Sequence, residues 1–176
     1  MGYIGNKPAK NVIFNGLQRL EYRGYDSAGI ATINKDLQVT KAVGETSNLN
    51  LDAIDDKAHM GIGHTRWATH GKPTETNAHP HTYGAVTLVH NGIIENYEEL
   101  RGVIDTSRLQ SQTDSEVLAA LIDHYFTKSK DLLQATKLAL ADAKGTLGIA
   151  VISKASPEQI VVARRGSPIV IGVGDK

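Results

Sequence analysis

The run from residue 64 to residue 71, His-Thr-Arg-Trp-Ala-Thr-His-Gly, holds the densest chemistry in this sequence. Its arginine, Arg66, carries a planar fork of N–H donors that matches the two oxygens of a carboxylate. The run closes an apolar segment, residues 60–67, that is typical of a strand. Arg66 is therefore a candidate carboxylate-binding residue. The alternative is a structural ion pair beside a core tryptophan.

A second candidate is the triplet His90-Asn91-Gly92, which follows an expected strand at residues 85–89. A turn at this place can aim a backbone N–H and the asparagine amide at one point, which is the geometry of an oxyanion hole. The alternative is strong, because Asn-Gly is also a common hairpin turn.

Asp114 is the third candidate. It stands in the segment Thr113-Asp114-Ser115-Glu116, which has the spacing of a helix capping box. In the first turn of a helix, a carboxylate usually supports the helix dipole. It could also hold the ammonium group of a substrate, and the two roles are compatible.

Histidines at positions 64, 70, 79, 81 and 90 raise the question of a metal site. No Asp or Glu completes a recognised metal-ligand spacing with them, so we predict no metal. The glycines match no phosphate-binding loop, so we predict no nucleotide and no other cofactor.

Composition narrows the classes of function further. The chain has 176 residues, 40 % of them hydrophobic and 22 % charged, which predicts one folded domain over residues 1–176. Nineteen basic residues balance nineteen acidic ones, so no global charge favours nucleic acid or an anionic membrane. The apolar runs are far shorter than the ~20 residues of a membrane span, and we expect a cytoplasmic protein. There is no cysteine, hence no disulfide and no thiol nucleophile.

Hydrophobic periodicity and turn residues place the elements that must position these candidates. Strands are expected at residues 28–33, 37–43, 60–67, 85–89, 147–152, 159–163 and 168–173. Helices are expected from a cap at Asn6 to Leu20, briefly within 47–58, from a cap at Asn96 to Leu100, from Thr113 to Phe126, and at about 130–144. Residues 68–83 are expected to be a loop. Hairpin-length connections favour a layered α+β sandwich of mostly antiparallel sheets, with helices outside.

Read together, six motifs resemble the glutaminase domain of glutamine–fructose-6-phosphate aminotransferases, also called glucosamine-6-phosphate synthases. These motifs are residues 21–29, 61–71, 77–81, 90–96, 112–114 and 163–168. The resemblance covers nearly the whole chain. Amidophosphoribosyltransferases are also similar, but they typically carry His-Arg-Gly-Gln where this chain has Tyr22-Arg23-Gly24-Tyr25.

The resemblance implies an N-terminal-nucleophile hydrolase, a four-layer αββα sandwich with two mostly antiparallel sheets. In that family the mature chain begins with a cysteine. Its thiolate attacks the side-chain amide of glutamine while its own α-amino group acts as the base. A γ-glutamyl thioester forms and is hydrolysed to glutamate. The released ammonia passes to an isomerase domain, where fructose 6-phosphate becomes glucosamine 6-phosphate.

The resemblance also assigns a glutamine pocket, with L-glutamine as substrate and L-glutamate as product. Arg66 would grip the α-carboxylate and Asp114 would pair with the α-ammonium. Trp67, Thr69 and His70 would shape the pocket around them. Two opposite charges at a fixed separation select an amino-acid zwitterion, which neither charge alone could do.

The resemblance places the catalytic groups beside this pocket. The Asn91 side chain and the Gly92 N–H would stabilise the tetrahedral oxyanion. Arg23 would order the loop near the nucleophile.

The sequence departs from the family at both ends. Gly2-Tyr3-Ile4-Gly5 matches the family's opening, but the cysteine and the two residues after it do not precede Met1. The chain also stops at Lys176, before the family's final strands and its isomerase domains. We therefore expect a glutaminase domain that is truncated, a sandwich incomplete at both ends, and no activity of this chain by itself.

Two explanations of this departure stay open: a piece of a normal enzyme, or a catalytically dead module that binds glutamine or glutamate. Another class II amidotransferase, such as an amidophosphoribosyltransferase, is the alternative family, and a structural partner of a full-length enzyme is a weaker one. The family's enzymes commonly dimerise through the isomerase part. We therefore expect a monomer or a weak dimer that would partner an isomerase domain, with no nucleic acid and no membrane.

Overall fold

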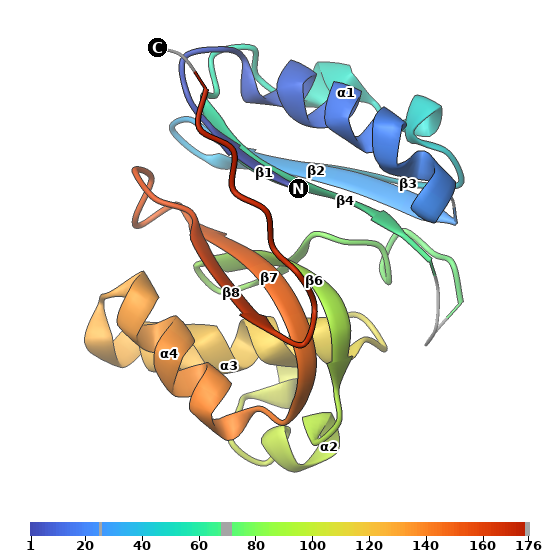
Figure 1. Cartoon of the computed structure of the whole chain (residues 1–176). Coiled ribbons are helices and arrows are strands. Elements are labelled where there is room, and N and C mark those ends of the chain that lie inside the picture. Colours follow the sequence, from blue (N-terminus) through green and yellow to red (C-terminus); the bar gives the residue numbers. More distant parts are fainter. Residues whose placement is uncertain (25, 68–71, 175–176) are drawn as a thin grey trace.

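Strand β2 (Ser27–Ile33) is buried along its whole length, so both of its faces are covered. Successive side chains of a strand point to opposite faces. Ala28 and Ile30 accordingly pack in a cluster with residues of helix α1 (Ala9–Leu20), whereas Ala31 and Ile33 pack in a cluster with residues of a second sheet. This strand therefore belongs to an inner layer of a helix–sheet–sheet–helix sandwich, as Figure 1 shows.

The computed structural model describes residues 1–24, 26–67 and 72–174. Within these ranges the strands form two four-stranded sheets, each entirely antiparallel. The first sheet has the order β1 (Gly2–Ile4), β4 (Met60–Arg66), β2 and β3 (Leu37–Val43). The second has the order β5 (His81–Tyr83), β6 (Val86–Ile94), β7 (Gly145–Ser153) and β8 (Val161–Arg165).

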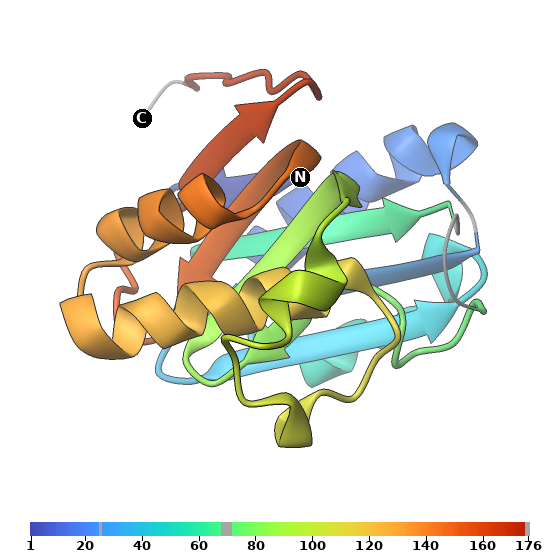
Figure 2. The same cartoon turned by 90° about the horizontal axis from the view of Figure 1, so that it is seen from below.

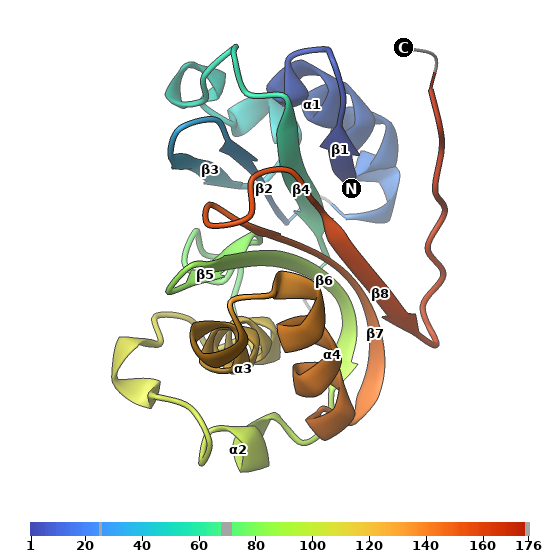
Figure 3. The same cartoon turned by 90° about the vertical axis from the view of Figure 1, so that its left-hand side faces the viewer.

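Helices cover the outer face of each sheet. Helix α1 lies over the first sheet, and α3 (Asp114–Ser129) and α4 (Leu132–Asp142) lie side by side over the second, as Figure 2 shows from below. Figure 3 gives the same four layers from the side. A short helix, α2 (Tyr97–Leu100), and four 3₁₀ turns complete the described elements. The turns are Glu21–Arg23, Thr46–Asn48, Leu51–Ala53 and Thr106–Arg108. No described helix is long and apolar enough to cross a bilayer.

Three apolar clusters hold the four layers together. One lies between α1 and the first sheet, one between the two sheets, and the largest between the second sheet and helices α3 and α4. The predicted α+β sandwich of antiparallel sheets is therefore confirmed.

The capping box at the start of α3 forms in part. Thr113 Oγ1 accepts a hydrogen bond from the Glu116 backbone N–H, as predicted. The Glu116 carboxylate instead accepts from the backbone N–H groups of Gln110 and Ser111, and so it fixes the loop that leads into the helix.

Several local predictions are wrong. His90-Asn91-Gly92 is not a hairpin turn, because β6 continues through it to Ile94 and pairs with β7 throughout. Gly92 allows this with φ at +138°, a conformation that L side chains rarely adopt. Residues 81–83, expected in a loop, form strand β5, and residues 168–173, expected as a strand, are irregular and carry exposed Val170 and Ile171.

Two expected caps also differ. The residue before α1 is Pro8, with no side-chain cap. Asn96 precedes α2 but does not cap it through its side chain. Its amide donates to the Asp142 carbonyl and accepts from the Lys144 N–H, so it ties α2 to the end of α4. Tertiary contacts thus outcompete the local role that the sequence indicates.

The backbone of β2 packs closely against a neighbouring segment at Gly29. A Cβ at this position would collide with the carbonyl oxygen of His79, which belongs to the segment that leads into β5. The close approach therefore requires glycine.

We expect Gly29→Ala to lower the free energy of unfolding by about 1–3 kcal/mol, because backbone cannot yield as a flexible side chain does. Urea denaturation measures this. Gly172→Ala, at a position where an added Cβ meets nothing, is the matched control and should leave the midpoint unchanged. Equal midpoints for both variants would contradict the interpretation of Gly29.

Candidate functional site

Strand alternation places the site residues at one end of the layer between the sheets. Ile62 of β4 lies in the cluster between the sheets, so His64 and Arg66, two and four residues on, share its face. Val89 of β6 lies in the same cluster, and Asn91 shares its face. The two strands thus bring polar groups together from opposite sheets.

These groups line a pocket of about 170 Å³ at the amino end of α3. Its lining comprises Arg23, His64, Thr65, Arg66, Trp67, His79, His90, Asn91, Gly92, Thr113, Asp114 and Ser115. Six of the residues singled out from sequence are therefore brought together. Thr69 and His70 lie outside the described residues. A larger hollow of about 620 Å³ runs along α1 and Met1 and contains none of the predicted site residues.

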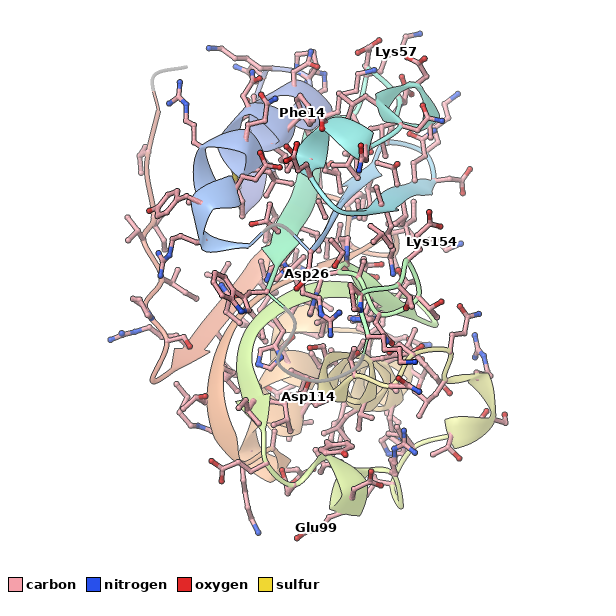
Figure 4. All side chains as sticks on the ribbon, turned by 90° about the vertical axis from the view of Figure 1, so that its right-hand side faces the viewer. Phe14, Asp26, Lys57, Glu99, Asp114 and Lys154 are labelled. Atoms are coloured by element: carbon pink, nitrogen blue, oxygen red, sulfur yellow. The ribbon has the colours of Figure 1, made fainter. Side chains whose placement is uncertain are left out.

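The two charged candidates enter the pocket from different layers. Arg66 ends β4 and is buried, and its guanidinium makes a long contact of 3.5 Å with the Lys72 carbonyl. Asp114 begins α3 on the side of the molecule seen in Figure 4. Its Oδ2 accepts a hydrogen bond of 2.7 Å from the Ile94 backbone N–H. The same cavity is therefore lined by one cationic side chain, from the end of strand β4, and one anionic side chain, from the start of helix α3.

Trp67 lies at the edge of this pocket with 63 % of its surface exposed. The alternative of an arginine beside a core tryptophan is therefore wrong. An exposed indole beside a polar cavity is suited to covering the apolar part of a small ligand. Arg23 reaches the same pocket from the 3₁₀ turn that follows α1.

Strand β6 presents its polar residues to both sides. Asn91 Oδ1 lies 2.8 Å from His64 Nε2 across the gap between the sheets. His90 faces the opposite way, and its Nδ1 lies 2.9 Å from the Ser115 hydroxyl of α3. Ser115 in turn makes a 3.4 Å hydrogen bond to Asp114 Oδ1. The Asp114 carboxylate is thus linked through Ser115 to His90, the residue that precedes Asn91 in β6.

The sequence motifs include His64 and His90 but assign no separate role in the pocket to them or to His79. Among the described residues no group of His, Cys, Asp and Glu could hold a metal ion. The rings of His64 and His79 instead contact each other at a tilt, with centroids 4.4 Å apart, and the His81 ring meets the His79 ring edge-on at 4.6 Å. Strand alternation from Ile62 was the available signal for His64.

These histidines are neutral because of their surroundings. Burial lowers the pKa of His64 to about 4, and it lowers the pKa values of His79 and His81 well below their ordinary value. Burial also lowers the pKa of His90, although the Asp114 carboxylate opposes the shift. The pocket therefore combines uncharged imidazoles with the charges of Arg66 and Asp114.

Comparison with known proteins gives a consistent result. A family model described as a glutamine amidotransferase domain matches residues 50–164. The chain is 46 % identical over 179 residues to the glutamine–fructose-6-phosphate aminotransferase (isomerizing) of Acinetobacter baylyi, covering 99 % of this chain and 29 % of that protein. The same enzyme of Haemophilus influenzae is 46 % identical over 181 residues, with 99 % and 30 % covered. The chain thus spans about 30 % of the length of these relatives.

Among solved structures, the glutamine phosphoribosylpyrophosphate amidotransferase of B. subtilis superimposes with a TM-score of 0.75 at 27 % sequence identity. The match covers 93 % of this chain and 36 % of that one. This likeness confirms the predicted fold class, the αββα sandwich of N-terminal-nucleophile hydrolases.

The buried histidines predict a stability that falls with acid. An unfolded histidine binds its proton near pH 6.5, whereas His64, His79 and His81 resist protonation in the folded chain. Below pH 6.5 the unfolded state therefore binds more protons. Each histidine should then remove up to about 1.4 kcal/mol of stability per pH unit, continuing for His64 to about pH 4.

Urea midpoints between pH 7.5 and pH 4.5 measure this slope. His79→Gln should reduce this slope by up to the contribution of one histidine. His124→Gln, at a half-buried position of α3 outside the pocket, is the control. A slope that is unchanged in His79→Gln would show that folding does not lower the pKa of His79.

Proposed function

The chain belongs to the family of glutamine amidotransferase domains, and we propose that it is the glutaminase part of a glutamine–fructose-6-phosphate aminotransferase. One observation carries the proposal: Arg66 and Asp114 line the same cavity as Asn91 and Gly92. A cavity with one cation and one anion suits the zwitterionic end of an amino acid, and an amide to be cleaved would then lie beside the asparagine.

Recognition of glutamine would use both charges. Arg66 binds the α-carboxylate through its paired N–H donors, and Asp114 binds the α-ammonium. Asp114 is already oriented by the Ile94 N–H and the Ser115 hydroxyl, so little side-chain freedom is lost on binding. Trp67 covers the pocket edge. Thr69 and His70 are proposed to complete the rim, and Arg23 to order the neighbouring loop.

The oxyanion of the tetrahedral intermediate would be stabilised by the Asn91 side-chain N–H and the Gly92 backbone N–H. Removal of one such donor typically costs about 2.7–4 kcal/mol of transition-state stabilisation. The backbone conformation that presents this N–H requires glycine, because a Cβ at position 92 would collide with the carbonyl oxygen of Thr146.

The nucleophile would enter along β1. Gly2 pairs with Ile62, and Met1 exchanges backbone hydrogen bonds with Gly63 in both directions. Residues placed before Met1 in the same register would lie opposite His64, Thr65 and Arg66 in turn. The third of them shares the face of Gly2, where an added side chain would meet Ile62 in the layer between the sheets.

A cysteine three residues before Met1 would therefore face the pocket beside Arg66. Its thiolate would attack the γ-carbonyl carbon of glutamine, and its own α-amino group would take the thiol proton and deliver it to the leaving ammonia. Water would then release glutamate from the thioester. The 176 residues contain no cysteine, so we propose that this chain binds glutamine or glutamate and does not hydrolyse it.

Two further aspects belong to the proposal. The ammonia acceptor would be fructose 6-phosphate on an isomerase domain of the same cytoplasmic enzyme. The present chain alone would be a monomer or a weak dimer.

An amidophosphoribosyltransferase is the second candidate function, favoured by the structural likeness. The 46 % identity to the aminotransferases, against 27 % to that structure, favours the first candidate.

Ligand binding tests the pocket in the chain as it is. Arg66→Ala and Asp114→Asn should each weaken binding of L-glutamate by about 10- to 100-fold in calorimetry, since a hydrogen bond to a charged group contributes about 1.5–3 kcal/mol. Arg101→Ala removes a half-buried arginine that pairs with Glu98 on α2, outside the pocket, and should leave binding unchanged. Binding that survives both pocket substitutions would refute the proposed pocket.

Catalysis tests the assignment of the nucleophile. A chain that begins Cys-Gly-Ile before Met1, with its initiator methionine removed, should release ammonia from L-glutamine. The matched chain that begins Ser-Gly-Ile should be slower by several orders of magnitude, because a serine hydroxyl is a far weaker nucleophile than a thiolate. Ammonia release by the 176-residue chain itself would show that another residue is the nucleophile.

A further inference from the structure

We propose that His64 is a positioning residue: it fixes which way the Asn91 side-chain amide faces, so that Nδ2 rather than Oδ1 is offered to the pocket. The contact itself is the distance of 2.8 Å between His64 Nε2 and Asn91 Oδ1. The catalytic meaning of this orientation rests on the proposed function, but the orientation itself does not.

An asparagine amide has a donor end and an acceptor end of nearly the same shape, so a rotation of 180° exchanges them at little steric cost. In an oxyanion hole only the donor end is useful, since a carbonyl oxygen would repel the developing negative charge. Something must therefore hold the amide in one of its two orientations. His64 and Asn91 are 27 residues apart and lie on different sheets, so only the tertiary structure supplies this contact.

The state of the imidazole determines the direction of the hydrogen bond. His64 is buried and its pKa is lowered to about 4, chiefly by burial and further by the Met1 ammonium, His90 and Arg66. At neutral pH its ring therefore carries one proton. Its Nδ1 is buried and has no hydrogen-bond partner within the described part of the chain, whereas Nε2 faces an acceptor oxygen. A proton on Nδ1 would be a buried donor without an acceptor, so the proton resides on Nε2. Asn91 must then turn its acceptor oxygen, Oδ1, toward Nε2.

The ring is held in place on two sides. The backbone of His64 pairs with Gly29 of β2, and its ring contacts the His79 ring with 40° between the two planes. Burial and these contacts define the position of Nε2, and the hydrogen bond from Nε2 in turn defines which end of the amide faces it. Asn91 lines the pocket, so Nδ2 is the end of its amide that remains to donate there.

Nitrogen NMR of the histidine rings tests the orientation in the 176-residue chain. His64 should have a protonated Nε2 and a bare Nδ1 from pH 7.5 down to about pH 5. Asn91→Asp retains an acceptor oxygen, so it should keep this tautomer and raise the pKa of His64. A proton on Nδ1, or an imidazolium at pH 7, would overturn the proposal.

Kinetics of the chain extended by Cys-Gly-Ile test the consequence. His64→Met, which keeps the bulk and removes the donor, should lower kcat by about 10²-fold with KM nearly unchanged. His64→Gln, whose amide can place a donor near the former Nε2, should restore most of kcat. His64→Met should add almost nothing in an Asn91→Ala background, because the amide to be oriented is then absent.

Full additivity of the two substitutions, or wild-type kcat in His64→Met, would refute the positioning role. Urea midpoints of each variant, with His124→Gln as the control, separate loss of folding from loss of orientation. If the extended chain releases no ammonia, the proposed function fails, and the ring tautomer still decides whether His64 orients the amide.

Discussion

The geometry of the site depends on one constraint, the two-residue alternation of side chains on the facing strands β4 and β6. Ile62 and Val89 lie in the apolar layer between the sheets. Once they do, His64 and Asn91 must emerge into the same layer where it opens at the pocket. A shift of one residue in either strand would direct these polar groups into an outer layer against a helix.

The pocket also illustrates how a polar site can be buried without a surplus of charge. Its histidines are neutral because burial disfavours the imidazolium form. The row formed by His64, His79 and His81 runs from the layer between the sheets to Thr113 at the start of α3. The charges of Arg66 and Asp114 are therefore flanked by neutral imidazoles. The same burial gives the fold its sensitivity to acid.

Local sequence signals predicted elements well where local interactions dominate. The Thr113 cap and the apolar face of α3 are examples. The same local signals gave wrong predictions where a contact with a residue distant in sequence replaces the local one. His90-Asn91-Gly92 has the composition of a turn, yet nine residues of β7 pair along β6 and carry the strand through it. Asn96 has the type of a cap, yet its amide satisfies the end of α4.

The sequence by itself determined the chemical types: an arginine and an aspartate suited to a zwitterion, an Asn-Gly pair suited to an oxyanion, and the layered fold. Only the tertiary structure decided how the side chains of these residues are oriented in the pocket. The contacts of His64 with Asn91 and of His90 with Ser115 join residues 27 and 25 positions apart. Such contacts follow from strand register and from the packing of one sheet on another, and no local pattern of residues encodes either.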